Sequence, residues 1–174
     1  MTLQEYQRRI LERRAFDEGS AKDLVYFLAV LRDRDGLAAL RGRIRKEDEA
    51  GRLAWDLMAL EERPDRAVEL LPRVAAFDDP WFFHTLTKAL LGQGRFKEAL
   101  ALAQQRLKQS AGDTSVINLV AKWLLGEGEH VLALEVAKRS LRLAPRQEDM
   151  QAVVNRAARK GSLGYPLYLD VLPK

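Results

Sequence analysis

Leu90-Leu91-Gly92-Gln93-Gly94 recurs further along the chain as Leu124-Leu125-Gly126-Glu127-Gly128. The similarity extends to both sides of this motif, so that nine of 34 positions are identical between residues 80–113 and 114–147. A period of this length is typical of proteins built from repeated helix-turn-helix units. The repeat therefore predicts the architecture of this part of the chain.

The composition of the 174-residue chain favours an all-α protein. Ala, Leu, Arg and Glu, which are good helix formers, are abundant, and the length predicts a single domain, residues 1–174. Apolar residues with helical spacing, together with Gly and Pro as breaks, indicate about ten helices. They are expected at about 2–16, 21–34, 48–62, 80–92, 96–109, 114–126, 130–143 and 147–160, with shorter ones carrying Leu37 and beginning at Pro64.

The chain lacks the residues of the common catalytic sites. It has no Cys and only two His, His84 and His130, which excludes disulfides, thiolate nucleophiles and Cys-based metal sites. No P-loop, HExxH or GxSxG motif is present. The Gly-x-Gly pairs at 92–94 and 126–128 lack the third Gly of a dinucleotide site and follow predicted helices. We therefore expect a protein that is not an enzyme and binds no cofactor or metal.

Charge and hydrophobicity indicate a soluble protein with at most a mild preference for acidic partners. Residues 1–6 lack the basic-then-apolar order of a secretory signal, and the longest apolar run, 24–31, is far shorter than a membrane span. We therefore expect a cytoplasmic location. The net charge is +4 because 29 basic residues are largely offset by 25 acidic residues.

Residues 80–147 resemble two tetratricopeptide repeats. That family places large residues in the first helix of each repeat, Gly before the turn, small residues in the second helix, and Pro after it. The matching positions are Phe83, Leu86, Leu90, Gly94, Ala99 and Ala103 in one repeat, and Ile117, Val120, Leu124, Gly128, Ala133, Ala137 and Pro145 in the other. The first repeat has no matching Pro, and Thr87 and Ala121 stand where the family often has Gly.

The resemblance implies a right-handed α-α superhelix, a tetratricopeptide-like solenoid. Residues 1–79 would form diverged helix pairs, and the polar outer face of 148–160 suits a capping helix. The resemblance also implies a non-catalytic scaffold that binds a peptide or protein partner in a concave groove lined by the first helix of each repeat.

A row of cations is expected in that groove. Three of them share one helical register, each separated from the next by one repeat period: Lys88, Lys122 and Arg156. One turn earlier the same register holds His84, Asn118 and Ala152. Stacked cations beside imidazole and amide groups suit the carboxylates of an acidic peptide. The alternative is that the lysines are solvated or pair with acids on a neighbouring helix.

Three further features leave alternatives open. Trp81 is either an aromatic anchor in the groove or packs against the preceding helix. The basic runs at 8–14 and 41–46 are either solvated helix faces or a nucleic-acid-binding surface. The apolar tail at 161–174 either caps its own solenoid or docks on a partner, including a second copy, which would make the protein a self-assembling subunit.

Overall fold

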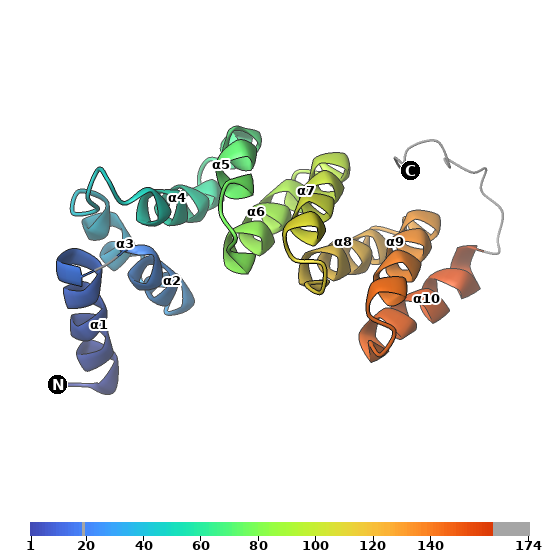
Figure 1. The fold of residues 1–174 in the computed structure, drawn as a ribbon, viewed down its shortest axis with the longest axis horizontal. Coiled ribbons are helices and arrows are strands. Elements are labelled where there is room, and N and C mark those ends of the chain that lie inside the picture. The colour runs from blue at the N-terminus through green and yellow to red at the C-terminus, as the bar shows by residue number, and fades with distance from the viewer. Residues whose placement is uncertain (19, 162–174) are drawn as a thin grey trace. The chain divides into compact units, whose positions relative to one another are not determined.

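The computed structural model describes residues 1–18 and 20–161, and the regular structure in these residues is helical (Figure 1). The prediction of an all-α protein is confirmed. The described helices gather in two compact units, Met1–Phe77 and a second unit that begins at Asp78. A single domain stays a prediction. The apolar tail lies outside the described residues, apart from Gly161 at the end of the last helix.

The described residues of the N-terminal unit form five α-helices and three short helical segments. The α-helices are α1 (Leu3–Arg13), α2 (Lys22–Val30), α3 (Arg34–Arg41), α4 (Glu49–Met58) and α5 (Leu71–Ala75). A π-helical turn (Arg14–Glu18) follows α1, and two 3-10 segments (Ala59–Glu61 and Pro64–Leu70) lie between α4 and α5. Helix α2 contacts α1, α3 and α4, and therefore lies at the centre of the unit.

Two local predictions for this unit are wrong. The second helix, expected at about 21–34, ends at Val30, and a new helix, α3, begins at Arg34, because Asp33 caps it by accepting the Gly36 N–H at 2.8 Å. The segment that begins at Pro64 is a 3-10 helix, and an α-helix starts only at Leu71. Proline is tolerated in the first turn of an α-helix but disrupts its interior, so Pro72 fits a helix that begins one residue earlier.

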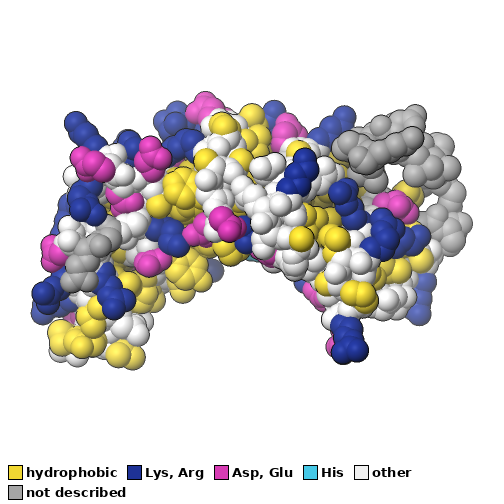
Figure 2. All heavy atoms as spheres, in the orientation of Figure 1, with side chains coloured by type: hydrophobic (Ala, Val, Ile, Leu, Met, Phe, Trp, Pro, Cys, Tyr) yellow, Lys and Arg dark blue, Asp and Glu magenta, His cyan; other side chains and the backbone are white. Residues whose placement is uncertain are grey.

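Helix α1 is amphipathic but buries none of its residues. Its apolar side chains remain largely exposed, with Leu3 at 72% and Tyr6 at 51% of their full accessibility. Hydrophobic side chains gather at the free end of α1 at the lower left of the surface in Figure 2. The helix is held by its capping box at Thr2 and Glu5 and by its contacts with α2.

Asp48 connects the beginnings of α2 and α4. Its carboxylate accepts the Gly51 N–H at 2.8 Å, which caps α4, and also the Ala21 N–H at 2.6 Å and the Ser20 hydroxyl at 2.7 Å. The Ser20 hydroxyl in turn accepts the Lys22 N–H at 3.2 Å. One carboxylate thus satisfies donors from two segments that lie well apart along the chain.

The described part of the C-terminal unit consists of five helices whose bounds agree closely with the prediction. They are α6 (Pro80–Gly92), α7 (Phe96–Gln109), α8 (Ser115–Gly126), α9 (His130–Leu143) and α10 (Glu148–Gly161). Helix α6 packs on α7 and α8, and α8 packs on α9 and α10, so α6, α8 and α10 contact one another in succession (Figure 1).

The core of this unit is built from the repeated positions. The large residues predicted for the first helices are all buried: Phe83, Leu86, Leu90, Ile117, Val120 and Leu124. The small residues of the second helices are fully buried as well: Ala99, Ala103, Ala133 and Ala137. A helix surface that presents only methyl groups allows its neighbour to approach closely, and the larger side chains fill the remaining space.

The turns within the two repeats require glycine at one position each. Gly94 and Gly128 have φ values of 70° and 84°, in the left-handed region, whereas no positive φ is recorded for Gly92 and Gly126. In both turns a residue after the helix closes the end, with Arg95 N–H bonded to Leu90 O and Glu129 N–H to Leu124 O, each at 2.9 Å.

We predict that Gly94→Ala lowers the free energy of unfolding by about 1 kcal/mol, because an L-residue is strained at positive φ. Space is not the reason, since a Cβ at Gly94 would meet no atom within 4 Å. Gly92→Ala, which also has open space, is the matched control and should leave stability unchanged or slightly raised. Urea denaturation of the two variants distinguishes backbone strain from a general effect of the substitution.

Candidate functional site

The three cations of the predicted row lie on alternate helices, of which the middle one contacts the other two. Lys88 is on α6, Lys122 on α8 and Arg156 on α10, and all three residues are exposed. Because their spacing equals the repeat period of the helices, they occupy equivalent positions along the three helices. We refer to these three residues as the cation row.

The middle member of the cation row pairs with an acid on a neighbouring helix, as the alternative interpretation expected for the lysines. Lys122 Nζ lies 2.7 Å from Asp149 Oδ2, a residue in the first turn of α10. The hydrogen bond to Lys122 lowers the pKa of Asp149. Both side chains are about half exposed, at 52% and 48%. The side chains of Lys88 and Arg156 form no hydrogen bond or ion pair with other described residues.

Asn118, predicted in the neighbouring row, is engaged in a polar network inside the unit. Its amide donates to Gln147 Oε1 at 2.6 Å, and its carbonyl oxygen accepts the Ser140 hydroxyl. Gln147 in turn donates to Ala144 O at 2.8 Å. The network joins α8, α9 and the segment before α10, so Asn118 has a structural role in this arrangement.

His84 remains in the row beside Lys88, one turn earlier on α6. It is half-buried, and burial lowers its pKa, with a smaller contribution from the charge of Lys88. A neutral imidazole is therefore favoured around pH 6.5, where an exposed histidine would be half charged. Because the folded pKa is depressed, the unfolded chain binds the proton more readily, and stability falls as the pH drops below about 6.5.

We predict that Lys88→Gln raises the pKa of His84, because one of the two causes of its depression is removed. An NMR titration of the His84 ring protons measures this shift. Lys97→Gln, at an exposed position on α7, is the control with the same charge change and should leave the titration unchanged. An identical His84 midpoint in the wild type and in Lys88→Gln would contradict the prediction.

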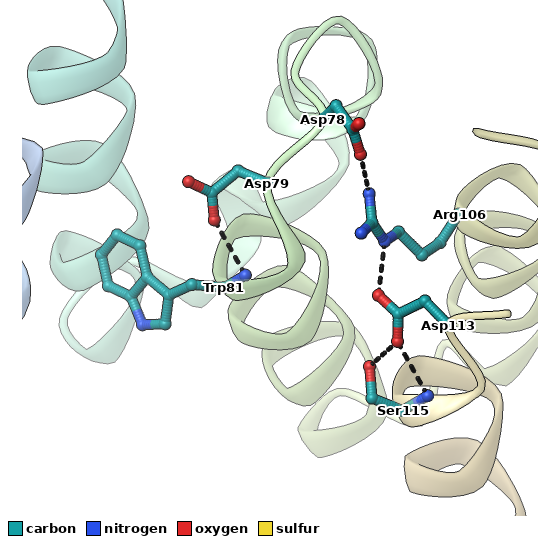
Figure 3. A network of polar contacts seen from close by, with 6 residues as sticks. All are labelled: Asp78, Asp79, Trp81, Arg106, Asp113 and Ser115. Carbon is teal, nitrogen blue, oxygen red and sulfur yellow. Dashed lines mark hydrogen bonds and ion pairs between the residues drawn. The ribbon is translucent and has the colours of Figure 1, made fainter. Parts of the chain in front are cut away.

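Trp81 and Ala152 complete the predicted positions. Trp81 is partly buried at the first turn of α6, and its ring centroid lies 5.5 Å from that of Phe82. Its backbone N–H donates to Asp79 Oδ1 at 2.9 Å, which caps the helix (Figure 3). Ala152 is exposed on α10.

The residue that sequence reasoning missed is Arg106, near the end of α7. Its side chain is only 6% exposed, its Nε lies 2.7 Å from Asp113 Oδ2, and Nη1 pairs with Asp78. Its guanidinium also lies 5.6 Å from the Phe83 ring centroid. Burial alone would lower the pKa of Arg106, but the hydrogen bonds that its guanidinium donates to Asp113 and Asp78 outweigh this effect and raise the pKa.

Asp113 extends this cluster to the start of α8. It accepts the Ser115 N–H at 3.1 Å and the Ser115 hydroxyl at 2.5 Å (Figure 3). Burial favours its neutral form, but the bonds from Ser115 and Arg106 prevail and lower its pKa. Arg106 therefore connects the end of α7 to the segments that precede α6 and α8. No motif marks the residue in the sequence, where a single arginine near a helix end is unremarkable.

Many of the basic residues that suggested a nucleic-acid surface have partners inside the N-terminal unit. Arg8 lies 3.3 Å from Glu12 and 3.6 Å from Asp33, and Arg43 lies 3.8 Å from Glu12. Arg41 stacks over the Trp55 ring at 4.6 Å. These contacts agree with the interpretation of solvated helix faces, and a nucleic-acid-binding surface stays a prediction.

Within residues 1–18 and 20–161, no cluster of His, Asp or Glu could hold a metal ion. None of the helices in the same residues combines the length and the hydrophobicity of a membrane span. Comparison of the chain with protein-family models, with curated proteins and with solved structures finds no match.

Proposed function

We propose that the protein is a non-catalytic interaction scaffold and that its C-terminal unit binds an acidic peptide segment along the cation row of α6, α8 and α10. The packing of α6 on α8 and of α8 on α10 supports a right-handed, tetratricopeptide-like superhelix in this unit. In such an arrangement the three helices would line one surface, and their equivalent positions would face the same ligand.

The observation that carries the proposal is the arrangement of the cation row, three exposed cations at equivalent positions of helices that contact one another in succession. The internal ion pair of Lys122 with Asp149, at 2.7 Å, gives the geometry in which a carboxylate reaches this surface. Lys88 and Arg156, which form no ion pair with other described residues, extend the same chemistry to both sides of Lys122. A peptide with acidic residues at matching intervals would then contact three cations.

Asp149 is not an obstacle to such a ligand. An exposed ion pair contributes about 0–1 kcal/mol, so a ligand carboxylate could replace Asp149 at small cost. Binding through several such contacts would depend strongly on salt, because the charges are screened over roughly 8–10 Å at physiological ionic strength. The row would therefore contribute both to affinity and to the rate of association.

We predict that Lys88→Glu with Lys122→Glu weakens binding of an acidic peptide at least tenfold. The probe is a fluorescein-labelled peptide selected from a library of short Glu- and Leu-containing peptides for binding to the wild-type protein, and fluorescence anisotropy gives the affinity. The two lysines attract the acidic peptide, whereas glutamates at the same positions would repel it, so a loss of affinity of this size is expected.

The matched control is Lys97→Glu with Lys108→Glu, which makes the same charge change at exposed positions of α7. Binding should be nearly unchanged in this variant. Equal losses in both variants would show that only the net charge matters, and full binding by Lys88→Glu/Lys122→Glu would exclude the row. Circular dichroism of each variant confirms that the helices are intact.

A further inference from the structure

The N-terminal unit contains a hollow of about 660 Å³ between the end of α3, helix α4 and helix α5. This volume is within the usual range for sites that hold small molecules, roughly 300–1,000 Å³. The residues that line it come from three short stretches of chain: Arg41, Ile44, Glu49, Arg52, Trp55, Asp56, Pro72, Arg73, Ala76 and Phe77. The hollow therefore combines basic, aromatic and aliphatic side chains.

Two of its walls are fixed by contacts inside the unit. The Trp55 indole N–H donates to Leu37 O at 3.2 Å, which sets the orientation of the ring. The Arg41 guanidinium stacks over this ring, 4.6 Å from its centroid. On the other side, Arg73 Nη1 donates to Asp56 Oδ2 at 2.5 Å, so these two charges neutralise each other.

The remaining charges favour an anion. Once Arg73 and Asp56 are paired, the lining retains Arg41 and Arg52 against the single carboxylate of Glu49. Neither Arg41 nor Arg52 forms an ion pair with a described residue. A guanidinium that stacks on an aromatic ring still presents its N–H groups at the edge, where they match the two oxygens of a carboxylate.

The rest of the lining favours a flat apolar group beside that anion. Pro72, Ala76 and Phe77 line the α5 side, and Ile44 follows α3. We propose that this hollow binds a small carboxylate carried on an aromatic or similarly flat apolar group. The carboxylate would contact Arg41 and Arg52, and the ring would lie against the apolar residues. The site is independent of the cation row in the C-terminal unit.

The test uses a pair of probes that share one ring system, 1-naphthaleneacetate and its neutral amide, 1-naphthaleneacetamide. Each is titrated into the full-length protein while the indole N–H signal of Trp55 is followed by NMR. The other two tryptophan signals are assigned with Trp81→Phe and Trp123→Phe. We expect a saturable shift of the Trp55 signal with the acid, and binding of the amide at least tenfold weaker. No shift with the acid up to its solubility limit, or equal binding of both probes, would overturn the proposal.

The arginines are tested with Arg41→Gln/Arg52→Gln, which should weaken binding of the acid at least tenfold and leave the amide unaffected. Arg9→Gln/Arg14→Gln, at exposed positions outside the hollow, makes the same charge change and should bind as the wild type does. Equal affinity of the acid for the two double variants would overturn the assignment to Arg41 and Arg52. Because Arg41 also stacks on Trp55, Arg52→Gln alone is the second variant, and a loss of binding in it with an unchanged Tm supports the site.

Discussion

Replacing Arg106 by leucine is expected to lower the free energy of unfolding by about 3–5 kcal/mol. The substitution removes a buried guanidinium and leaves the Asp113 carboxylate, only 18% exposed, without its charged partner. The contact with Asp78 contributes little to this loss, because the Asp78 side chain is 73% exposed and regains water. Urea denaturation followed by circular dichroism measures the change.

Three variants separate the ion pair from other effects of the substitution. Arg106→Lys keeps the charge but loses the planar fork, so its loss should be smaller than that of Arg106→Leu. Arg142→Leu, at an exposed position of α9, is the control and should change stability by no more than about 0.5 kcal/mol. Adding Asp113→Asn to Arg106→Leu removes the unpaired charge and should restore part of the stability. A loss in Arg106→Leu no larger than that of the control would contradict the prediction.

The same cluster predicts how stability depends on acid. The pKa of Asp113 is lowered in the folded protein from its ordinary value of 3.8. A carboxyl whose folded pKa is depressed stabilises the protein above the unfolded pKa, and this contribution disappears as the pH falls through the folded pKa. The difference in stability between the wild type and Arg106→Leu should therefore be full at pH 6 and shrink below about pH 4. A difference that stays constant down to pH 2.5 would exclude the carboxylate as its source.

Gly51→Ala is expected to destabilise the N-terminal unit by about 2–4 kcal/mol, the sum of a lost helix cap and a donor left without its partner. A Cβ at this position would lie well under 3.0 Å from the Asp48 carboxylate and 3.0 Å from the Ala21 Cβ. The carboxylate would have to move away and would lose the hydrogen bonds that it accepts at the starts of α2 and α4. Loss of a helix cap costs about 1 kcal/mol, and each buried donor left without a partner adds about 1–3 kcal/mol.

Gly42→Ala is the matched control in the same unit, because a Cβ at Gly42 meets no atom within 4 Å and its φ is −72°. It should be neutral to within about 0.5 kcal/mol. Asp48→Ala should cost about as much as Gly51→Ala, and the double variant no more than either, since both substitutions break the same contacts. Additive losses in thermal or urea denaturation would show that the glycine acts by another route.

The sequence was a good guide wherever one local pattern decides the structure. The repeated motif with Gly94 and Gly128 predicted both turns, and the helix expected at 80–92 has these bounds in α6. It was a poorer guide in the N-terminal unit, where no repeat sets the register. There the short 3-10 segments and the early end of α2 at Val30 depend on neighbouring helices and caps.

The candidate site was predicted only in part, for the same reason. The repeat period placed Lys88, Lys122 and Arg156 in one register of three contacting helices. The period could not show that Asp149 reaches Lys122 or that Asn118 is used within the unit. Those contacts depend on the approach of α10 to α8 and α9, which no residue of the motif encodes.

The difference between what the repeat predicts and what packing decides is clearest in the two segments that follow the second helix of each repeat. Arg106 and Ser140 are one repeat period apart, and so are Asp113 and Gln147. The two members of each pair therefore occupy equivalent positions in the two repeats. After the first repeat, the buried Arg106–Asp113 ion pair connects the second helix to the segment that follows it. After the second repeat, neutral hydrogen bonds make this connection, and Gln147 Nε2 lies 3.0 Å from the Ser140 hydroxyl. Both sets of contacts provide hydrogen-bond partners for the polar groups buried in these segments.

By itself, the sequence determined that the chain is helical, where the helices of the repeats begin and end, and which of their faces are buried, because periodicity and turn residues act locally. Only the tertiary structure decided which polar groups bind each other after each repeat and which cations form no ion pair with other described residues. It also decided that Arg41, Arg52 and Trp55 line one hollow. These contacts depend on the packing of segments distant in the sequence, and the strength of each polar contact depends on how deeply it is buried.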